Sequence, residues 1–248
     1  IIESLDPIQI YWNNPNQEID LDDHYESSLP LTFTFSGNSM ISASVLDGNI
    51  LSLTPATDWY GTEYITIRAT NSVGYVEQIL KVTVIQTWQI AEDFDHEGSV
   101  PENWTSSHAG TTDFPWQPEM IEGDDYAMKT MATTGRTANE RLFSPTYNLS
   151  NYEDIVVSFD TDFLPYGTGS GTFAYTLNNV TYTVVETFST ETTGTMTYTI
   201  SNLDAKPAVK FRWIYANSSA NTGQDNHWIV DDFSIFGVVR DTQAPSAV

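Results

Sequence analysis

GTFAYTLNNVTYTVVETF, residues 171–188, consists of two runs rich in Thr, Val, Tyr and Phe that flank the pair Asn178-Asn179. β-Branched and aromatic residues suit the pleated, half-buried surface of a strand, and asparagine tolerates the left-handed backbone of tight hairpin turns. The stretch therefore predicts two antiparallel strands joined by a tight turn at the two asparagines.

Runs of similar composition recur along the whole chain, and helical periodicity is almost absent. Gly, Asn, Asp and Ser, which favour turns, separate the runs. Short strands at this spacing predict an all-β fold made of β-sandwiches. The other predicted strands are LTFTF (31–35), NILSLTP (49–55), YITIRAT (64–70), EQILKVTVIQ (77–86), DIVVSFDTDF (154–163), TMTYTI (195–200), AVKFRWIY (208–215) and WIVDDFSIFG (228–237).

The composition of the sequence changes near Gln86-Thr87, where an alternating run ends and a stretch rich in Trp and turn residues begins. Five of the seven Trp residues follow this point. We therefore expect two sandwiches in series, one at 1–86 and one at 87–240. The end of the chain, DTQAPSAV (241–248), has the composition of a linker, so we expect the chain to be a piece of a longer polypeptide with further modules.

The charge of the chain limits its partners. Nine basic residues stand against 33 acidic ones, giving a net charge of -24. Such a field repels nucleic acid and anionic membrane surfaces and attracts divalent cations. There is no cysteine, which excludes disulfides and thiolate chemistry, and no apolar run long enough to span a membrane.

Motifs of enzymatic chemistry are missing from the sequence. The four histidines form no HExxH or His-x-His pair, and there is no Gly-x-Ser-x-Gly or Ser-x-x-Lys motif. GTGSG (167–171) joins two predicted strands without a following helix, so it reads as a flexible loop rather than a phosphate loop. The sequence predicts that this chain is not an enzyme.

One acidic stretch, AEDFDHEGSVPENW (91–104), leaves three alternatives open. Asp93, Asp95 and Glu97 alternate, so on a strand they point to one face, about 6.5–7 Å apart. Glycosidases place their two carboxyl groups about 5–5.5 Å or about 6.5–9.5 Å apart, so spacing alone permits a catalytic set. A calcium site and a solvated edge strand fit the spacing equally well.

The first module resembles the Ig-like, cadherin-like repeats of large bacterial surface proteins. The residues that carry this resemblance are IDLDDHYESSLPLTFTFSGN (19–38), LTPATDWYGTEYITIRATNSVGY (53–75) and LKVTV (80–84). The resemblance implies a spacer or adhesion role. The calcium-ligating linkers of true cadherins are missing, so no metal is expected in this module.

The second module resembles the jelly-roll domains called MAM-like, cleaved-adhesin or choice-of-anchor modules. The match runs through EDFDHEGSVPENW (92–104), DDYAM (124–128), LFSPTYNLSNYEDIVVSFD (142–160), VKFRWIY (209–215) and NHWIVDDFSIFG (226–237). It implies a concanavalin-like or galactose-binding-like jelly roll on a secreted or cell-surface bacterial protein. Many such modules carry a structural calcium ion, Ca²⁺.

The resemblance also implies how the acidic stretch is used. Jelly-roll glycosidases of the laminarinase type carry Glu-x-Asp-x-x-Glu on a central strand. Here Asp93 stands where their nucleophilic glutamate would be, so the stretch does not match a catalytic set. The family frame instead places the opening strand beside the closing one, near the Asp231-Asp232 pair, and adjacent carboxylates favour a bridging cation. The expected calcium ligands are Asp93, Asp95, Asp113, Asp124, Asp231 and Asp232.

Aromatic residues are the candidates for a ligand-binding surface, since sugar rings stack on exposed aromatic faces. Trp104 and Trp228 occupy frame positions of the family and are expected in the core. Trp116, in the loop DFPWQP, is the best candidate for an exposed platform, together with Tyr126 and Tyr166.

The sequence thus predicts a non-catalytic adhesion or substrate-binding region, calcium-stabilised, that takes an extracellular glycan or protein ligand. The alternative is a carbohydrate-binding module that serves an absent glycosidase or protease domain.

Overall fold

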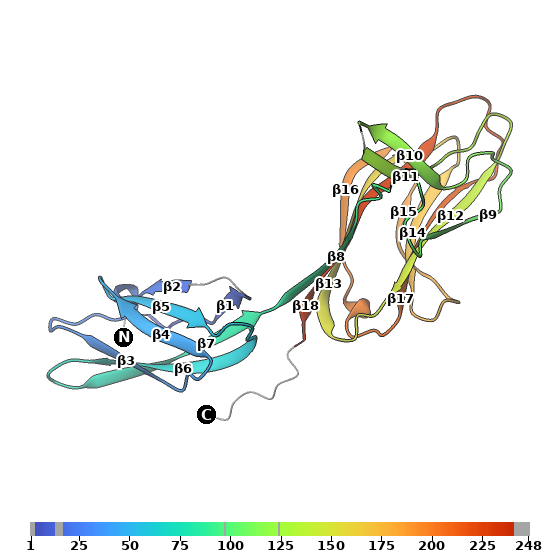
Figure 1. Cartoon of the computed structure of the whole chain (residues 1–248). Coiled ribbons are helices and arrows are strands. Elements are labelled where there is room, and N and C mark those ends of the chain that lie inside the picture. The colour runs from blue at the N-terminus through green and yellow to red at the C-terminus, as the bar shows by residue number, and fades with distance from the viewer. Residues whose placement is uncertain (1–2, 13–16, 97, 124, 241–248) are drawn as a thin grey trace. The chain divides into compact units, whose positions relative to one another are not determined.

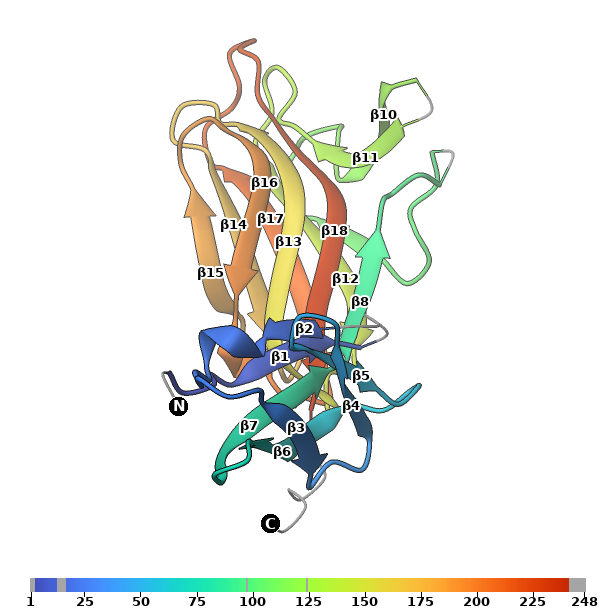
Figure 2. The ribbon, with the colours of Figure 1, turned by 90° about the vertical axis from the view of Figure 1, so that its left-hand side faces the viewer.

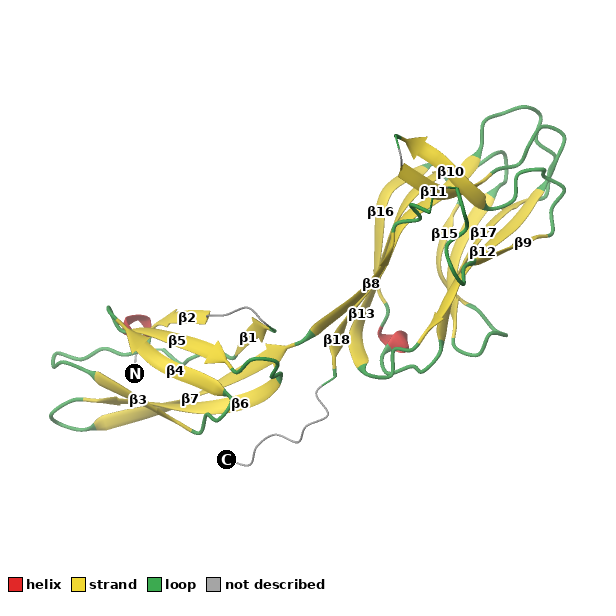
Figure 3. Cartoon of the chain, in the orientation of Figure 1, coloured by secondary structure: helices red, strands yellow, loops and turns green. Residues whose placement is uncertain are grey.

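The computed structural model of the chain describes residues 3–12, 17–96, 98–123 and 125–240 (Figure 1). Strands dominate, and the helical elements in this part of the chain are two single turns of 3-10 helix, Leu21–Asp23 and Ser201–Leu203 (Figure 3). The all-β prediction is confirmed. The expected linker 241–248 lies outside the described residues. No helix in the described ranges is long and apolar enough to cross a membrane.

The chain divides into two compact units: the described residues up to Thr87, together with Val239 and Arg240, form the first, and Trp88–Val238 form the second. The first unit holds a four-stranded sheet in the order β1-β7-β6-β3 and a three-stranded sheet in the order β2-β5-β4. Its strands are β1 (Ile8–Tyr11), β2 (Gln17–Asp20), β3 (Thr32–Ser36), β4 (Ile41–Leu46), β5 (Ile50–Pro55), β6 (Gly61–Thr70) and β7 (Tyr75–Ile85). Alternate apolar residues of β5, β6 and β7 form its core, which includes the fully buried Leu51, Leu53, Ile65, Ile67, Leu80 and Val82.

A buried carboxylate fixes the turn between β3 and β4. Glu63, on β6, accepts hydrogen bonds from the backbone N–H groups of Ser39 (2.9 Å), Met40 (2.8 Å) and Ile41 (3.0 Å), and from the Ser39 hydroxyl (2.5 Å). Burial raises the pKa of Glu63, but these hydrogen bonds together outweigh burial, and the net pKa is lowered. Glu63 therefore serves the fold in its charged form.

The second unit holds two larger sheets. One has the order β10-β11-β18-β13-β16, with β8 also paired to β18, and the other has the order β15-β14-β17-β12-β9 (Figure 2). The strands are β8 (Thr87–Glu92), β9 (Thr105–His108), β10 (Gln117–Glu122), β11 (Asp125–Thr130), β12 (Ala138–Tyr147), β13 (Tyr152–Leu164), β14 (Ser170–Thr176), β15 (Thr183–Phe188), β16 (Thr192–Thr199), β17 (Val209–Asn217) and β18 (His227–Val239). This is a β-sandwich of the jelly-roll kind.

Aromatic side chains fill the space between these two sheets. The fully buried ones include Phe159, Phe173, Phe211, Trp213, Trp228 and Phe233. Many of their rings meet edge-to-face, as Phe159 and Trp213 do with centroids 5.4 Å apart. Trp104 and Trp228 are both buried in this core, as predicted.

The predicted hairpin at residues 171–188 forms, but its turn is wider than the tight turn predicted. β14 and β15 pair antiparallel, and β15 begins only at Thr183. The Asn178 side chain accepts hydrogen bonds from the N–H groups of Val180 and Thr181, both at 2.9 Å, and Asn179 has a φ of +58°. The asparagines therefore do form the turn, but the loop they close is longer than predicted, and the Asn178 side chain stabilises it by accepting hydrogen bonds from the loop's own backbone.

Candidate metal site

Strand β18 contains an extra residue at its two aspartates. Val230 and Phe233 are both buried in the core although they are three positions apart, which breaks the alternation of a regular strand. Asp232 has a φ of +45°, and its N–H donates to Asp231 Oδ1 at 2.8 Å. We interpret this as a β-bulge, in which one added residue lets both aspartates point away from the core.

Strand β18 also changes its neighbour along its length. β11 pairs with Trp228, Ile229 and Val230, immediately before the bulge. β8 pairs with β18 as well and runs beside its later part (Figure 2). The bulge therefore lies where the start of β11 and the loop that follows β8 both come close to β18.

The loop after β8 presents two aspartates on either side of a buried ring. Phe94 has a φ of +58°, is buried, and packs edge-to-face on Trp104 with ring centroids 4.8 Å apart. The Asp95 N–H donates to Asp93 Oδ1 at 3.1 Å, and Asp95 Oδ1 accepts the Tyr126 N–H of β11 at 2.8 Å. Phe94 thus anchors the loop in the core, and Asp93 and Asp95 remain exposed on it.

This geometry corrects the prediction that the alternating acidic residues lie along a strand. β8 ends at Glu92, and the residues that follow form a loop with a left-handed residue at Phe94. The physical reason is the left-handed backbone of Phe94, because a strand needs an extended φ at every residue and therefore cannot continue through this position. Glu97 lies outside the described residues.

The carboxylates of several segments lie within electrostatic range of one another. Burial raises the pKa of Asp231 to about 7, and repulsion from Asp232, Asp125 and Asp95 adds to the rise despite the hydrogen bond from the Asp232 N–H. Burial also raises the pKa of Asp232, with repulsion from Asp160, Asp125, Asp93 and Asp95. Within the described residues, none of these aspartates forms an ion pair with Lys or Arg. The site is therefore a cluster of mutually repelling carboxylates.

Within the described residues, one group of three donor atoms is close enough together to share a metal ion, and it includes Asp93. Ligand atoms of Glu92, Asp93 and His96 lie within 4.8 Å of one another. His96 Nε2 lies 2.9 Å from Glu92 Oε1, which also accepts the Phe94 N–H at 3.0 Å. Glu92 and His96 thus brace the loop, and Asp93 is common to both groups.

Of the six predicted ligands, four lie within electrostatic range of one another: Asp95 acts on Asp231, and Asp93 and Asp95 both act on Asp232. Asp113 lies apart from them, with its Oδ2 3.6 Å from Arg136 Nη2, because its loop is tied by the Thr112 hydroxyl to the Met131 carbonyl. Asp124 lies outside the described residues. Asp125 and Asp160 were not predicted. Asp125 was visible in the sequence pair Asp124-Asp125, whereas no local signal separates Asp160 from any other outward-facing strand residue.

The predicted aromatic platform is not formed by Trp116. Its side chain is buried, and its ring packs against that of Trp228 with centroids 5.7 Å apart. The preceding loop folds inward because the Thr130 hydroxyl donates to the Phe114 carbonyl at 3.0 Å. Trp116 is a core residue, so the prediction of an exposed platform at this position was wrong.

The other two predicted ligand-binding residues are half-buried and lie in different places. Tyr126 is on β11, where its backbone N–H donates a hydrogen bond to Asp95 Oδ1. The Tyr166 hydroxyl lies 3.2 Å from Thr222 Oγ1, and its carbonyl accepts the Asn217 side-chain amide at 2.8 Å. The structure does not unite Tyr126 and Tyr166 into one surface with Trp116.

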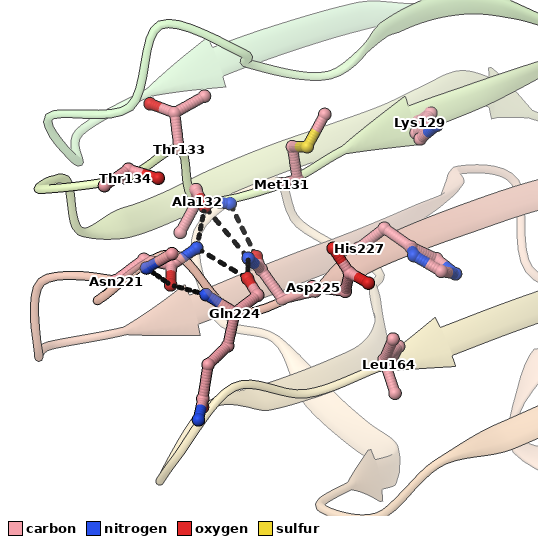
Figure 4. Close-up of a pocket in the computed structure, with 12 residues that line it drawn as sticks. Lys129, Met131, Ala132, Thr133, Thr134, Leu164, Asn221, Gln224, Asp225 and His227 are labelled. Carbon is pink, nitrogen blue, oxygen red and sulfur yellow. Dashed lines mark hydrogen bonds between the residues drawn. The ribbon is translucent and has the colours of Figure 1, made fainter.

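A hollow of about 590 Å³ lies near Tyr166, at the loop between β17 and β18 (Figure 4). The side-chain amides of its two buried asparagines, Asn221 and Asn226, are hydrogen-bonded within the chain. Asn221 donates to the carbonyls of Ala132 (2.7 Å) and Gln224 (2.9 Å) and accepts the N–H groups of Gly223 and Gln224. Asn226 accepts the Ala132 N–H and the Tyr215 hydroxyl and donates back to the Ala132 carbonyl.

These bonds give the polar lining of the hollow a structural role. The donors and acceptors of both buried asparagines are occupied by the chain itself, which leaves them unavailable to a ligand. At the rim, His227 Nε2 lies 3.0 Å from Asp162 Oδ2, an ion-pair distance without hydrogen-bond geometry. The carboxylate cluster is therefore the better candidate for a functional site.

Comparison with known proteins gives distant structural similarities alone. No protein-family model matches the sequence, and no curated protein is similar to it. Two cleaved adhesin domains of Lys-gingipain from Porphyromonas gingivalis are similar in structure. The first has 13% identity and a TM-score of 0.44 and covers 60% of this chain and 97% of its own. The second has 10% identity and a TM-score of 0.42 and covers 59% of this chain and 97% of its own. A family 11 carbohydrate-binding module from Clostridium thermocellum, solved with a mixed-linked tetrasaccharide, is similar at 16% identity and a TM-score of 0.37, over 59% of this chain and 94% of that one. Similarity at this level carries no conclusion about function.

Proposed function

We propose that the chain is a non-catalytic, extracellular binding region whose jelly roll is closed by a bound calcium ion. The observation that carries this proposal is the carboxylate cluster, in which Asp93 and Asp95 follow the first strand of the unit and Asp231 and Asp232 lie on its last strand. An ion between them would join two segments about 140 residues apart in sequence and hold the unit where its ends would otherwise fray.

The chemistry of the cluster fits calcium. Ca²⁺ takes six to eight oxygen ligands in a flexible arrangement, from carboxylates, carbonyls and water. With Asp125 the cluster offers five carboxylates, and its exposed side leaves room for water. In the absence of a cation, burial and repulsion hold the pKa of Asp231 near 7. A divalent ion would relieve that repulsion and favour the charged form of every member.

The placement of the cluster supports binding and structure rather than catalysis. Its carboxylates lie on the outside of the sheet, and the backbone already uses one oxygen each of Asp93, Asp95 and Asp231 as acceptor. The hollow at residues 129–134 and 221–227 is a separate place. An extracellular location also fits calcium binding. Calcium is present outside cells at millimolar levels, and protein sites of this kind bind it in that concentration range.

Chelation tests this proposal. An ion that binds only the folded state stabilises it by about 2.7 kcal/mol when calcium is present at one hundred times Kd. For a unit of this size that corresponds to a rise of about 5–10 °C in melting temperature. We expect calorimetry of the full chain to show this difference between chelator and millimolar calcium in the transition of the second unit only.

The variant Asp231→Asn with Asp232→Asn should abolish the calcium-dependent difference, because it removes the two carboxylates of the bulge. Asp113→Asn with Asp225→Asn is the matched control, since it removes two exposed carboxylates of the same unit outside the cluster. The control should keep the full difference. Equal melting of the wild type with and without calcium would show that the cluster is a solvated acidic edge.

A further inference from the structure

The five-stranded sheet of the second unit carries an uncompensated group of cations on its outer face. β12 and β17 pair so that Phe143 lies opposite Arg212 and Arg141 opposite Ile214. The residues that alternate with them, among them Leu142 and Trp213, are buried in the core. Arg141, Phe143, Arg212 and, two residues before Arg212, Lys210 therefore share the face that points away from the core.

Aromatic rings accompany these cations. The Arg212 guanidinium lies 3.6 Å from the ring centre of Tyr182, and Lys210 Nζ lies 5.3 Å from that of Phe143. The Phe143 and Tyr182 ring centres are 6.5 Å apart, and both rings are half-buried, so each keeps part of its surface open. Cations and rings thus form one continuous patch, which we call the cationic face and define as Arg141, Phe143, Tyr182, Lys210 and Arg212.

The cationic face is exceptional in so acidic a chain. Strands β9, β12, β14 and β17 together contain a single acidic residue, Glu140, which is fully buried and lies 2.8 Å from His108 Nδ1. The edge strand β15 adds one more, the exposed Glu186. Within the described residues, no carboxylate pairs with Arg141, Lys210 or Arg212, whereas Arg68, Lys129 and Arg136 each have one.

The cations of this face also repel one another. Burial lowers the pKa of Arg212, and the nearby Arg141 adds to this, while Tyr182 opposes it. The Arg212 Nε is buried without a hydrogen-bond partner in the described part of the chain. An anionic group that reached this face would relieve the repulsion between the two arginines.

We propose that the cationic face binds an anionic polysaccharide whose sugar units carry carboxylate groups. The proposal rests on the binding role proposed above but uses none of the residues of the carboxylate cluster. Guanidinium groups match carboxylates in a two-pronged geometry, and the parts of the two rings that stay exposed add apolar surface for the sugar. The net charge of -24 opposes the approach of any polyanion, so binding must come from short-range contacts with this one face.

The rest of the face suits a carbohydrate better than a peptide. Strands β14, β17 and β12 have neighbours on both sides, so no free backbone edge is available here for a peptide to add as a strand. By register, the hydroxyl residues Thr105 and Ser107 lie opposite Phe143 and Arg141, and Ser170 and Thr172 lie opposite Ala216 and Ile214. Hydroxyl side chains on the same face can exchange hydrogen bonds with the hydroxyl groups of sugars.

Calorimetric titration of the full chain with oligogalacturonate tests this proposal. The matched ligand is the same oligosaccharide with its carboxyl groups reduced to alcohols. We expect binding of the carboxylated form that weakens as salt increases, and at least about tenfold weaker binding of the reduced form. This comparison uses only wild-type protein, so it does not depend on how any variant folds. Absence of binding by oligogalacturonate overturns the proposal.

Variants then locate the site. Arg141→Gln with Lys210→Gln should weaken binding by about tenfold or more, because two of the three cations are lost. Lys81→Gln with Lys206→Gln removes the same charge elsewhere and should leave the affinity within about twofold. Unchanged binding in the first variant overturns the assignment to this face, and equally tight binding of poly-glutamate overturns the choice of a carbohydrate.

The titrations are made in both chelator and calcium. Binding in chelator that is lost in Arg141→Gln with Lys210→Gln supports the cationic face whether or not the calcium site exists. Binding that needs calcium and survives the loss of these cations contradicts this assignment and points to the carboxylate cluster instead.

Discussion

Trp116→Ala is expected to destabilise the second unit by about 3–5 kcal/mol, the usual cost of truncating a buried tryptophan. The reason is that Trp116 is buried against Trp228 and contributes to the aromatic core. For a unit of about 150 residues this predicts a fall of roughly 6–20 °C in melting temperature. Differential scanning calorimetry of the full chain measures it, and the transition of the first unit should not move.

The same variant separates a core residue from a sugar-binding platform. If Trp116 were a platform, its loss would leave the melting temperature nearly unchanged and reduce binding of a sugar ligand. Trp116→Phe is the control, because it keeps an aromatic ring in the core and should cost less than Trp116→Ala. An unchanged melting temperature in Trp116→Ala would contradict the packing described for this residue.

Glu63→Ala is expected to destabilise the first unit by about 3 kcal/mol or more. Each hydrogen bond to a charged group contributes about 1.5–3 kcal/mol, and removal of Glu63 leaves three backbone N–H groups of residues 39–41 without their acceptor. Because the first unit is small, the fall in its melting temperature should be at least about 12 °C. Glu63→Gln keeps one acceptor oxygen and should cost less, and Glu77→Ala, whose carboxylate is exposed, is the control.

The lowered pKa of Glu63 also fixes the direction of a pH effect. A carboxylate with a lowered pKa contributes stability that is fully present above the pKa of the unfolded chain, about 4.3 for glutamate, and is lost as pH falls through the folded value. The wild-type first unit should therefore lose stability below about pH 4, and Glu63→Ala should lose less over the same range. Parallel pH profiles for the two proteins would show that Glu63 does not act through its charge.

Strands with clear alternation could be predicted from the sequence, whereas strands that bury polar groups could not. DIVVSFDTDF alternates and forms the centre of β13. β12 alternates just as regularly in burial, yet its inward residues include Glu140 and Ser144. Glu140 is accommodated by His108 on β9, and Ser144 Oγ accepts the Phe211 N–H of β17 at 2.9 Å. Both partners are distant in sequence, so local composition does not reveal them.

The sequence predicted only part of the candidate site, because the rest depends on packing between distant segments. The family resemblance places the first and last strands of the jelly roll side by side, which is enough to bring Asp93 and Asp95 near Asp231 and Asp232. The bulge in β18 depends on Val230 and Phe233 both entering the core, and the contribution of Asp160 depends on the register of β13 beside β18. Trp116 was misjudged because prolines nearby indicate a loop but not which side of the loop faces the core.

Direct titration of calcium into the chelator-treated full chain is the most direct test of the central claim, that an ion closes the jelly roll at the carboxylate cluster. Calorimetry should detect one ion per chain with a Kd of about 10⁻⁵ M or tighter, as millimolar calcium requires for the stabilisation described above. The heat of binding should disappear in Asp231→Asn with Asp232→Asn and persist in Asp113→Asn with Asp225→Asn. A wild-type titration without binding heat, or one that the bulge variant leaves unchanged, would contradict the claim.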